Sequence, residues 1–288
     1  MTSIIIPAHN ESRVIGRLLA QLVPPAGDAE FSIVVVANGC TDDTAEIAAG
    51  FGRAVRVLTL AQASKWAALT AGARAAGGFP HVYLDADVEL AAADVRALVA
   101  PLAEPGILAT GPRRVLALGA SRWPVRWYYS VWARLPEVRR GLFGRGAFAV
   151  GERGYQRLAR LPSVLADDLA ASLAFAPHER RIAAGACVTV HPPRAFGDLL
   201  RRRVRAVAGV AQLERSAHPP QWSARTRPAD LAVILCREPW LAPQTAVFLG
   251  VALLARLRAR RTIARGDYSA WPRDDSSRAA GGSHFAAF

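Results

Sequence analysis

The sequence predicts an α/β fold: a Rossmann-like, mostly parallel sheet with flanking helices, followed by apolar and amphipathic helices toward the C-terminus. Strand and helix patterns alternate through the first hundred residues. The strand patterns are continuous apolar runs, such as Phe31–Val36, which is typical of strands buried on both faces. A βαβαβαβ order of this kind implies parallel strands with helices on both faces of the sheet.

Four strands and three helices are expected in this first part of the chain. The strands are Ser3–Pro7, Phe31–Val36, Val55–Leu58 and His81–Leu84, and the helices are Glu11–Leu22, Thr41–Gly50 and Lys65–Ala76. Thr41 fits the N-cap of its helix, since acidic residues follow in the first turn. Right-handed crossovers place the loops after the strands along one edge of the sheet, where ligands bind in such folds.

Beyond about residue 110 the alternation weakens. A helix starting near Pro124 aligns Trp123, Trp127 and Val131 on one face. Such a stripe usually forms core, but a ligand groove or a membrane interface uses the same residue types. Phe196–Glu214 is expected to form an amphipathic helix with a basic face.

A second apolar stretch, Trp240–Ala255, precedes an arginine-rich run over residues 256–261. At 16 residues it is shorter than the roughly 20 needed to span a bilayer. A re-entrant or surface-lying segment, or a docked core helix, is therefore favoured over a full span. The flanking arginines favour contact with an anionic inner leaflet. From about Ala264 the composition turns to Gly, Ser, Asp and Arg, which predicts a disordered tail.

The net charge of +13 is unevenly distributed along the 288 residues. Residues 1–110 carry 7 basic and 11 acidic side chains, whereas residues 111–288 carry 29 basic and 12 acidic ones. A basic half suits nucleic acid, a diphosphate or an anionic membrane surface. The three cysteines form no CxxC pair, which favours a reducing compartment and hence a cytoplasmic location.

The strongest local signal is the segment Val82–Glu89, in which Asp85 and Asp87 follow the fourth strand. Two aspartates two positions apart at the end of a strand are able to direct both carboxylates toward one cation. Mg²⁺ or Mn²⁺ suits such carboxylates together with diphosphate oxygens, and would offset charge on a departing nucleoside diphosphate. A turn or a cap is the other interpretation of this pattern.

The N-terminal half resembles the family 2 glycosyltransferases, which have the GT-A fold and are inverting enzymes that use nucleotide-activated sugars. The matching segments, in order, are Ile5–Glu11, Val34–Thr44, Ser64–Gly72 and Leu84–Asp87, and the likeness extends over roughly residues 1–215. The resemblance implies a GT-A domain over residues 1–227, with a nucleotide-sugar half (1–110) and an acceptor half (111–227). An apolar, membrane-associated segment (228–262) and the tail (263–288) would follow.

The resemblance places Pro7, Ala8 and Glu11 around the nucleoside, with Glu11 near the ribose or the base. Complementarity to a helix N-terminus is the other interpretation of Glu11, and it is compatible with binding. Ala37 and Asn38 stand where the family usually has two acidic residues. An aspartate accepts an N–H of the base, whereas an asparagine offers both a donor and an acceptor, so this position departs from the family's uridine preference. UDP is nevertheless the expected nucleotide.

Two further positions match the family's donor site. Asp42 matches a later aspartate, and a helix cap is the equally weighted alternative. Lys65 is the only lysine in the chain and falls where the family has a basic residue near the phosphates or the ribose.

The acceptor half carries a motif at residues 165–169 that resembles the family's Glu-Asp pair, with Asp167 in place of the glutamate. The resemblance makes Asp168 the general base that deprotonates an acceptor hydroxyl. Adjacent carboxylates in a partly apolar setting raise one pKa, which suits a base; N-capping of the following helix is the alternative. Gly144 and Gly146 resemble the family's acceptor loop, where missing side chains let a sugar approach the backbone.

A run of arginines, Arg201–Arg205, sits where processive members carry Q-x-x-R-W, and Ala206 replaces the tryptophan. This loss argues for transfer of a single sugar. Arg205, with Arg202, is expected to clamp the diphosphate. His191 is either a third metal ligand or a structural histidine.

The sequence thus predicts a metal-dependent transfer of one sugar from a nucleotide-diphosphate donor to an acceptor hydroxyl, in cell-surface glycan, glycolipid or polysaccharide synthesis. A lipid-linked acceptor and a peripheral position on the inner face of the cell membrane fit the basic, apolar C-terminus. A nucleotidyltransferase would carry a G-x-G loop after the first strand, which Pro7–Glu11 is not. A nonenzymatic anion or nucleic-acid binder is the third alternative, and no nucleic-acid partner is expected because no known nucleic-acid motif accompanies the arginines.

Overall fold

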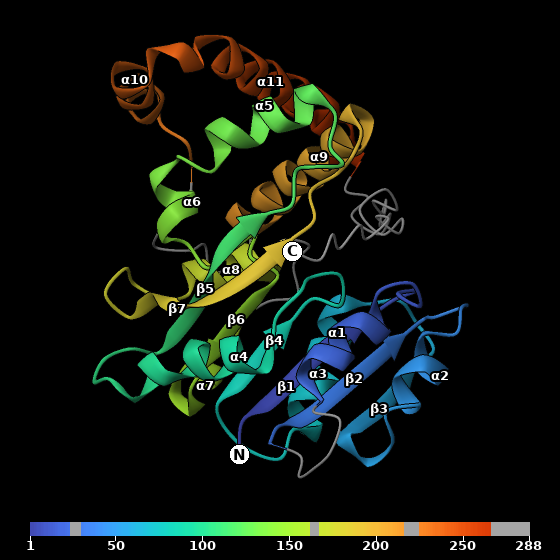
Figure 1. Ribbon diagram of the computed structural model, residues 1–288. Helices are drawn as coiled ribbons and strands as arrows, with labels where there is room; N and C mark the ends of the chain where they lie inside the picture. The colour runs from blue at the N-terminus through green and yellow to red at the C-terminus, as the bar shows by residue number, and fades with distance from the viewer. Residues whose placement is uncertain (24–29, 162–166, 216–224, 266–288) are drawn as a thin grey trace, which may run out of the picture.

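A seven-stranded sheet with helices on both faces forms the body of the protein (Figure 1). The computed structural model describes residues 1–23, 30–161, 167–215 and 225–265, with only the backbone described for Asp167 and residues 261–265. The strands are β1 (Ser3–Ala8), β2 (Ser32–Asn38), β3 (Val55–Leu60), β4 (His81–Leu84), β5 (Ala109–Leu116), β6 (Ala147–Val150) and β7 (Arg180–Val190). Their order is β3-β2-β1-β4-β6-β5-β7, and only β6 runs antiparallel to its neighbours. The predicted mostly parallel α/β fold is confirmed.

The helices alternate with these strands and then gather at one end of the sheet. They are α1 (Ile15–Leu22), α2 (Thr44–Ala49), α3 (Lys65–Ala75), α4 (Ala92–Val99), α5 (Trp123–Trp132), α6 (Pro136–Arg140), α7 (Glu152–Leu158), α8 (Asp167–Leu173), α9 (Phe196–Glu214), α10 (Pro228–Arg237) and α11 (Ala242–Arg265). The chain leaves β5 and β7 to enter α5 and α9, which lie with α11 beyond the ends of these strands (Figure 1).

The order of the strands reverses between β1 and β4, which are parallel neighbours in the middle of the sheet. From β1 the chain moves outward through β2 to β3, and it then returns to the other side of β1 as β4. The loops at the carboxyl ends of β1 and β4 therefore diverge and leave a crevice. This is the place where open parallel sheets bind ligands.

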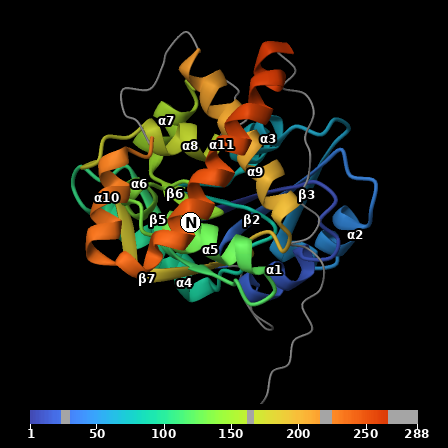
Figure 2. The same cartoon turned by 90° about the horizontal axis from the view of Figure 1, so that it is seen from above.

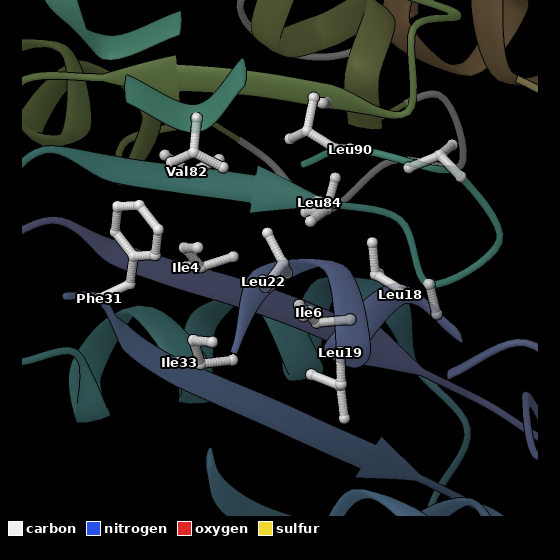
Figure 3. Packing of buried hydrophobic residues seen from close by; sticks show 14 of the residues in the cluster. Ile4, Ile6, Leu18, Leu19, Leu22, Phe31, Ile33, Val82, Leu84 and Leu90 are labelled. Carbon is white, nitrogen blue, oxygen red and sulfur yellow. The ribbon is translucent and has the colours of Figure 1, made fainter. Parts of the chain in front are cut away.

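The main core lies on one face of the sheet, where α1 and α4 cover it. Figure 3 shows Ile4 and Ile6 of β1 beside Leu18, Leu19 and Leu22 of α1, and all five side chains are at most 1% exposed. Successive side chains of a strand point to opposite faces, so Ile5 faces α3 instead. Helix α3 packs closely there because a Cβ on Gly72 would lie only 2.5 Å from Ile5 Cγ2.

A second core joins α5, α6, α9, α10 and α11 (Figures 1 and 2). Tyr128, Val131 and Phe248 are buried in it, and the Tyr128 and Phe248 rings stack with their centroids 5.1 Å apart. The predicted aromatic stripe is therefore divided: Tyr128 is core, whereas Trp123 is 59% exposed. Helices α10 and α11 belong to this core by their contacts, while the division of the chain at residue 227 stays a prediction.

Several predicted boundaries are wrong in detail. The first helix begins at Ile15 and not at Glu11, because residues 11–14 form a turn closed by the Glu11 carbonyl. Helix α2 begins at Thr44 and not at Thr41, whose N–H donates instead to the Asn10 side chain across the loop. Residues 266–288, which include most of the predicted disordered tail, lie outside the described residues.

The C-terminal helix is longer than the apolar stretch that predicted it. Within the described residues, the segment Pro239–Arg260 is one helix of 22 residues that is long and apolar enough to cross a membrane by length and composition. Only 28% of its most apolar window is buried inside the protein. Length and composition alone do not separate a membrane helix from a packed one, and α11 contacts both α5 and α9.

Candidate functional site

A cavity of about 170 Å³ opens in the crevice beside the carboxyl ends of β1 and β4. Most of the predicted site residues line it: Pro7, Glu11, Asn38, Lys65, Asp85, Asp87, Gly144, Gly146, Asp168 and Arg205. They come from the N-terminal half, from the loop before β6, and from helices α8 and α9. Residues more than 150 positions apart in the sequence thus line one cavity. This agrees with the prediction that the loops after the strands lie along one edge of the sheet.

Asp85 and Asp87 follow β4 and lie in this cavity with Lys65. The Lys65 ammonium forms an ion pair with Asp85 Oδ1 at 2.9 Å. Asp85 is also fixed through its backbone, since its N–H donates to the Gly146 carbonyl at 2.7 Å. Lys65 begins helix α3, whose N-cap is Ser64, with Ser64 Oγ accepting from the Ala67 N–H. The only lysine of the chain is therefore fixed beside the carboxylates.

The two carboxylates fit a divalent cation that keeps open positions for a diphosphate. Mg²⁺ is usually bound by one or two carboxylates, with waters and substrate phosphates completing the octahedron. Gly146 keeps the space next to Asp85 open, because a Cβ there would lie 3.5 Å from Asp85 Oδ2 and 2.4 Å from Val88 Cγ1. Among the described residues, no group of three or more His, Cys, Asp or Glu side chains is arranged to hold a metal ion. Asp85 and Asp87 alone thus suit a metal ion whose remaining ligands come from the substrate and from water.

His191 lines the same cavity, but its Nε2 lies 2.9 Å from Glu89 Oε1. Arg17 also approaches Glu89 Oε1, at 3.3 Å. Glu89 and Thr189 exchange backbone hydrogen bonds just before His191. This contact with Glu89 fits the second of the two interpretations of His191, that of a structural histidine.

Asn38 ends β2 and is only 3% exposed. Its Nδ2 donates to the Ala8 carbonyl at 2.8 Å, and its Oδ1 accepts from the Ser64 N–H at 3.0 Å. Its backbone carbonyl lies 2.7 Å from His9 Nδ1. Asn38 therefore joins the ends of β1 and β2 to the start of α3. It lines the cavity, while much of its side-chain amide is engaged within the protein.

Glu11 and Asp42, both predicted to bind the donor, take different places in the structure. Glu11 is 7% exposed and lines the cavity, and its N–H donates to Thr44 Oγ1. Asp42 does not line the cavity; it accepts from the Thr44 hydroxyl and N–H and from the Ser12 N–H. Asp42 thus accepts the first N–H of α2, from Thr44, although the N-cap residue itself is Asp43; this is the helix-cap alternative shifted by one residue. Ala8 is fully buried and contributes its carbonyl.

Asp168 also lines the cavity, from the first turn of α8. Its Oδ2 accepts from the Gly144 N–H at 2.7 Å and its Oδ1 from the Leu169 N–H at 2.8 Å. The predicted base and the predicted glycine loop are therefore in direct contact. The side chain of Asp167 lies outside the described residues.

The basic face of α9 divides between the cavity and the surface. Arg202 and Arg205 line the cavity, as predicted for a diphosphate clamp. Arg201 instead forms an ion pair with Asp198 one turn earlier and is exposed. Positions three apart lie on the same side of a helix, which explains why Arg202 and Arg205 both reach the cavity.

Arg114 is a residue of the site that the sequence analysis did not identify. Its guanidinium donates to the carbonyls of Val138, Phe143 and Gly144, with the closest contact at 2.8 Å to Gly144. Burial, with the nearby Arg145 charge adding to it, lowers the pKa of Arg114 to about 9. Nothing in the local sequence of β5 marks this residue among 35 arginines, because its role comes from a loop 30 positions away.

The fold, with its cavity beside the carboxyl ends of β1 and β4, is that of a family of glycosyltransferases. The family model of glycosyl transferase family 2 matches residues 3–151, and the chain belongs to this family. Uncharacterized glycosyltransferases of Mycobacterium bovis and Mycobacterium tuberculosis are 34% identical over 122 residues. The match covers 42% of this chain and 52% of each relative, so the chain spans about half the length of the curated relatives it matches.

Two solved structures show the same fold over most of the chain. A mannosyltransferase from Pyrobaculum calidifontis, in complex with GDP-Man and Mn²⁺, has a TM-score of 0.60 at 23% identity, covering 92% of this chain and 79% of that one. Glucosyl-3-phosphoglycerate synthase from Mycobacterium tuberculosis, in complex with Mn²⁺, UDP-Glc and phosphoglyceric acid, has a TM-score of 0.54 at 20% identity, covering 74% and 78%. Both confirm the fold.

We predict that Asp42→Ala destabilises the protein and leaves the site chemistry intact. Loss of a capping carboxylate costs about 1 kcal/mol. Although burial acts to raise it, hydrogen bonds from Thr44 and Ser12 lower the pKa of Asp42 below 3.8. The contribution of the Asp42 carboxylate to the free energy of unfolding is therefore fully present above pH 3.8. It is lost as the pH falls through the lower pKa of the folded state.

Urea unfolding of both proteins between pH 7 and pH 3 measures this difference in stability. The gap between wild type and Asp42→Ala should narrow toward the acid end. A gap that is independent of pH, or a variant that loses nucleotide binding while remaining equally stable, would contradict the capping role.

Proposed function

We propose that this family 2 glycosyltransferase transfers a single sugar, with inversion, from a nucleoside-diphosphate donor to an acceptor hydroxyl. The observation that carries the proposal is the convergence of Asp85, Asp87, Lys65, Arg205 and Asp168 on one cavity. The set combines acidic and basic groups suited to a metal diphosphate with a hydrogen-bonded carboxylate suited to a base.

The donor would lie with its diphosphate between the carboxylates and the arginines. Asp87, with Asp85, would hold Mg²⁺ or Mn²⁺, which supplies charge stabilisation to the departing diphosphate. Arg202 and Arg205 reach the same cavity, and arginine suits two-point contact with phosphate oxygens. The two similar structures hold GDP-Man or UDP-Glc with Mn²⁺, so the fold accommodates either base. We propose UDP for this chain.

Asp168 would act as the base in a direct displacement. The acceptor oxygen forms a bond to the anomeric carbon, and its proton passes to Asp168. The bond from the anomeric carbon to the diphosphate oxygen breaks, and its electron pair leaves with the nucleoside diphosphate. Each oxygen of Asp168 receives one backbone N–H, and since a carboxylate oxygen has two lone pairs, one remains for the proton.

The acceptor is proposed to belong to a cell-surface glycan, a glycolipid or a polysaccharide, and to receive one sugar per binding event. Ala206 supports a single transfer, because it stands next to the Arg205 clamp where processive members carry tryptophan. A small side chain there leaves no aromatic surface to hold a growing polymer at that position.

We predict that Asp168→Asn lowers kcat by about 10² to 10⁴, the usual contribution of a general base. Donor affinity should stay within about twofold, because Asp168 lies at the acceptor end of the cavity. Asp43→Asn is the matched control, since Asp43 is exposed and its side chain makes no capping hydrogen bond. Steady-state transfer assays with purified variants measure both constants; near-normal transfer by Asp168→Asn would rule out its assignment as base.

We predict that UDP and Mn²⁺ together raise the melting temperature more than the sum of either alone. A ligand at about 100 times its Kd stabilises the native state by about 2.7 kcal/mol. Asp87→Asn should abolish the effect of the metal and leave a weaker shift by UDP. A thermal-shift screen of UDP, GDP and their sugars, with Mn²⁺ or with EDTA, measures this. Equal shifts in EDTA would overturn the metal assignment, and a larger shift by GDP would overturn the choice of UDP.

We further propose that the protein works in the cytoplasm, bound peripherally to the inner face of the cell membrane through α11. Leu249, Leu253 and Leu257 recur at helical spacing on the outward side of α11 and are 46–58% exposed. The exposed Arg256 and Arg258 follow at the same end of the helix. An apolar stripe flanked by arginines matches the requirements of a helix lying on an anionic bilayer.

We predict that vesicles of phosphatidylglycerol and phosphatidylcholine sediment the full chain, and that pure phosphatidylcholine vesicles do so at least tenfold less. The double variant Leu249→Glu and Leu253→Glu should lose binding, since each leucine contributes about 1.5–3 kcal/mol when buried. Val115→Glu is the control, because it places the same charge on an exposed apolar position of β5. Undiminished sedimentation of the double variant would contradict the proposal.

A further inference from the structure

A second cavity of about 260 Å³ lies between α5, α9 and α11, behind the catalytic end of the site. We call it the aromatic chamber, because Tyr128, Tyr129, Trp132, Phe143 and Phe248 line it. The chamber opens to the surface, so it is not an internal void, and it leaves room for part of a ligand.

The aromatic chamber is continuous with the donor cavity. The two share Lys65, Asp85, Gly144, Asp168, Arg202 and Arg205 as lining residues. Trp132 stands at the junction, since a Cβ on Gly144 would lie only 3.2 Å from Trp132 Cη2. The Arg114 guanidinium covers the Trp132 ring at 4.3 Å. A molecule in the chamber would thus lie beside both Asp168 and the edge of Trp132.

The lining of the chamber defines the chemistry of its occupant. Trp132 and Phe143 are half-buried and present aromatic surface to the chamber, whereas Tyr128, Tyr129 and Phe248 are at most 6% exposed and pack in the second core. Asp168, Lys65 and the arginines of α9 supply polar groups in the same lining. We infer that the acceptor is amphiphilic, with its hydroxyl at Asp168 and a ring-sized apolar group held in the aromatic chamber. This inference rests on the proposed function, which places the acceptor hydroxyl at Asp168.

Two small or medium side chains of α9 control how much of the chamber is open. Ala206 and Val210 both line it, one turn apart, and both are half-buried. A larger residue at either position would fill the chamber without removing any of its aromatic walls. The small side chain of Ala206 stands where processive members carry tryptophan, and it therefore also leaves room for the apolar part of the acceptor.

Binding to the full chain tests the inference with two probes that differ only in their aglycone, phenyl β-D-glucopyranoside and methyl β-D-glucopyranoside. Isothermal titration is carried out with and without UDP and Mn²⁺. The phenyl glycoside should bind at least about tenfold more tightly, because burial of an aromatic ring is worth more than the 1.4 kcal/mol that corresponds to tenfold. Ala206→Phe and Val210→Phe should each abolish that preference.

Ala246→Phe is the matched control, since it adds the same ring on the exposed side of α11, and it should keep the preference. Circular dichroism verifies that each variant is folded. Because Ala206→Phe and Val210→Phe both fill the chamber, the test still stands if one of the two fails to fold. Equal binding of the two glycosides, or a preference that survives in both filled variants, would overturn the inference. The failure of the proposed function would show differently, as the absence of any response to UDP and Mn²⁺.

Discussion

The loop that contains Gly144 and Gly146 is the constraint on which the rest of the site depends, because its backbone holds both Asp85 and Asp168 in the cavity. The Gly144 N–H donates to Asp168, and two residues later the Gly146 carbonyl accepts from the Asp85 N–H, each at 2.7 Å. The φ angles of the two glycines are 63° and 68°, in the left-handed region that other residues rarely adopt. A single turn of backbone therefore sets the spacing between the two carboxylates, although they belong to different halves of the chain.

Two buried arginines hold that loop in place, and their burial shows how strongly the loop is constrained. The Arg114 contacts described above are all with backbone carbonyls. Arg145 likewise donates to the backbone carbonyls of Pro112, Gly141 and Arg139. Burial lowers the pKa of both, to about 9 for Arg114 and about 10 for Arg145. A buried cation is costly unless its donors are satisfied, and a guanidinium has five N–H groups with which to satisfy several carbonyls at once. The hydrogen bonds that offset the cost of burying these two cations therefore also fix the loop.

Sequence predicted the parts of the molecule that local pattern determines. The buried strands follow from runs such as Phe31–Val36, and the pairing of Arg202 with Arg205 on one side of α9 follows from helical spacing. The internal bonds of Asn38 and the role of Arg114 could not be predicted, because each depends on backbone groups that only the folded chain brings near. The aromatic run of α5 was ambiguous for the same reason, since core and ligand-lining residues share one composition.

Helix α11 connects the two proposals about the acceptor, because its opposite sides face different surroundings. Phe248 points into the second core and lines the aromatic chamber, whereas Leu249 and Leu253 lie on the exposed side. If that exposed side rests on a bilayer, the chamber lies one helix away from the lipid. An amphiphilic acceptor would then have to cross only the width of α11 to reach Asp168. The C-terminal segment, which the sequence set apart from the catalytic domain at residue 227, would in that case form a wall of the acceptor site, and its removal would affect acceptor binding before donor binding.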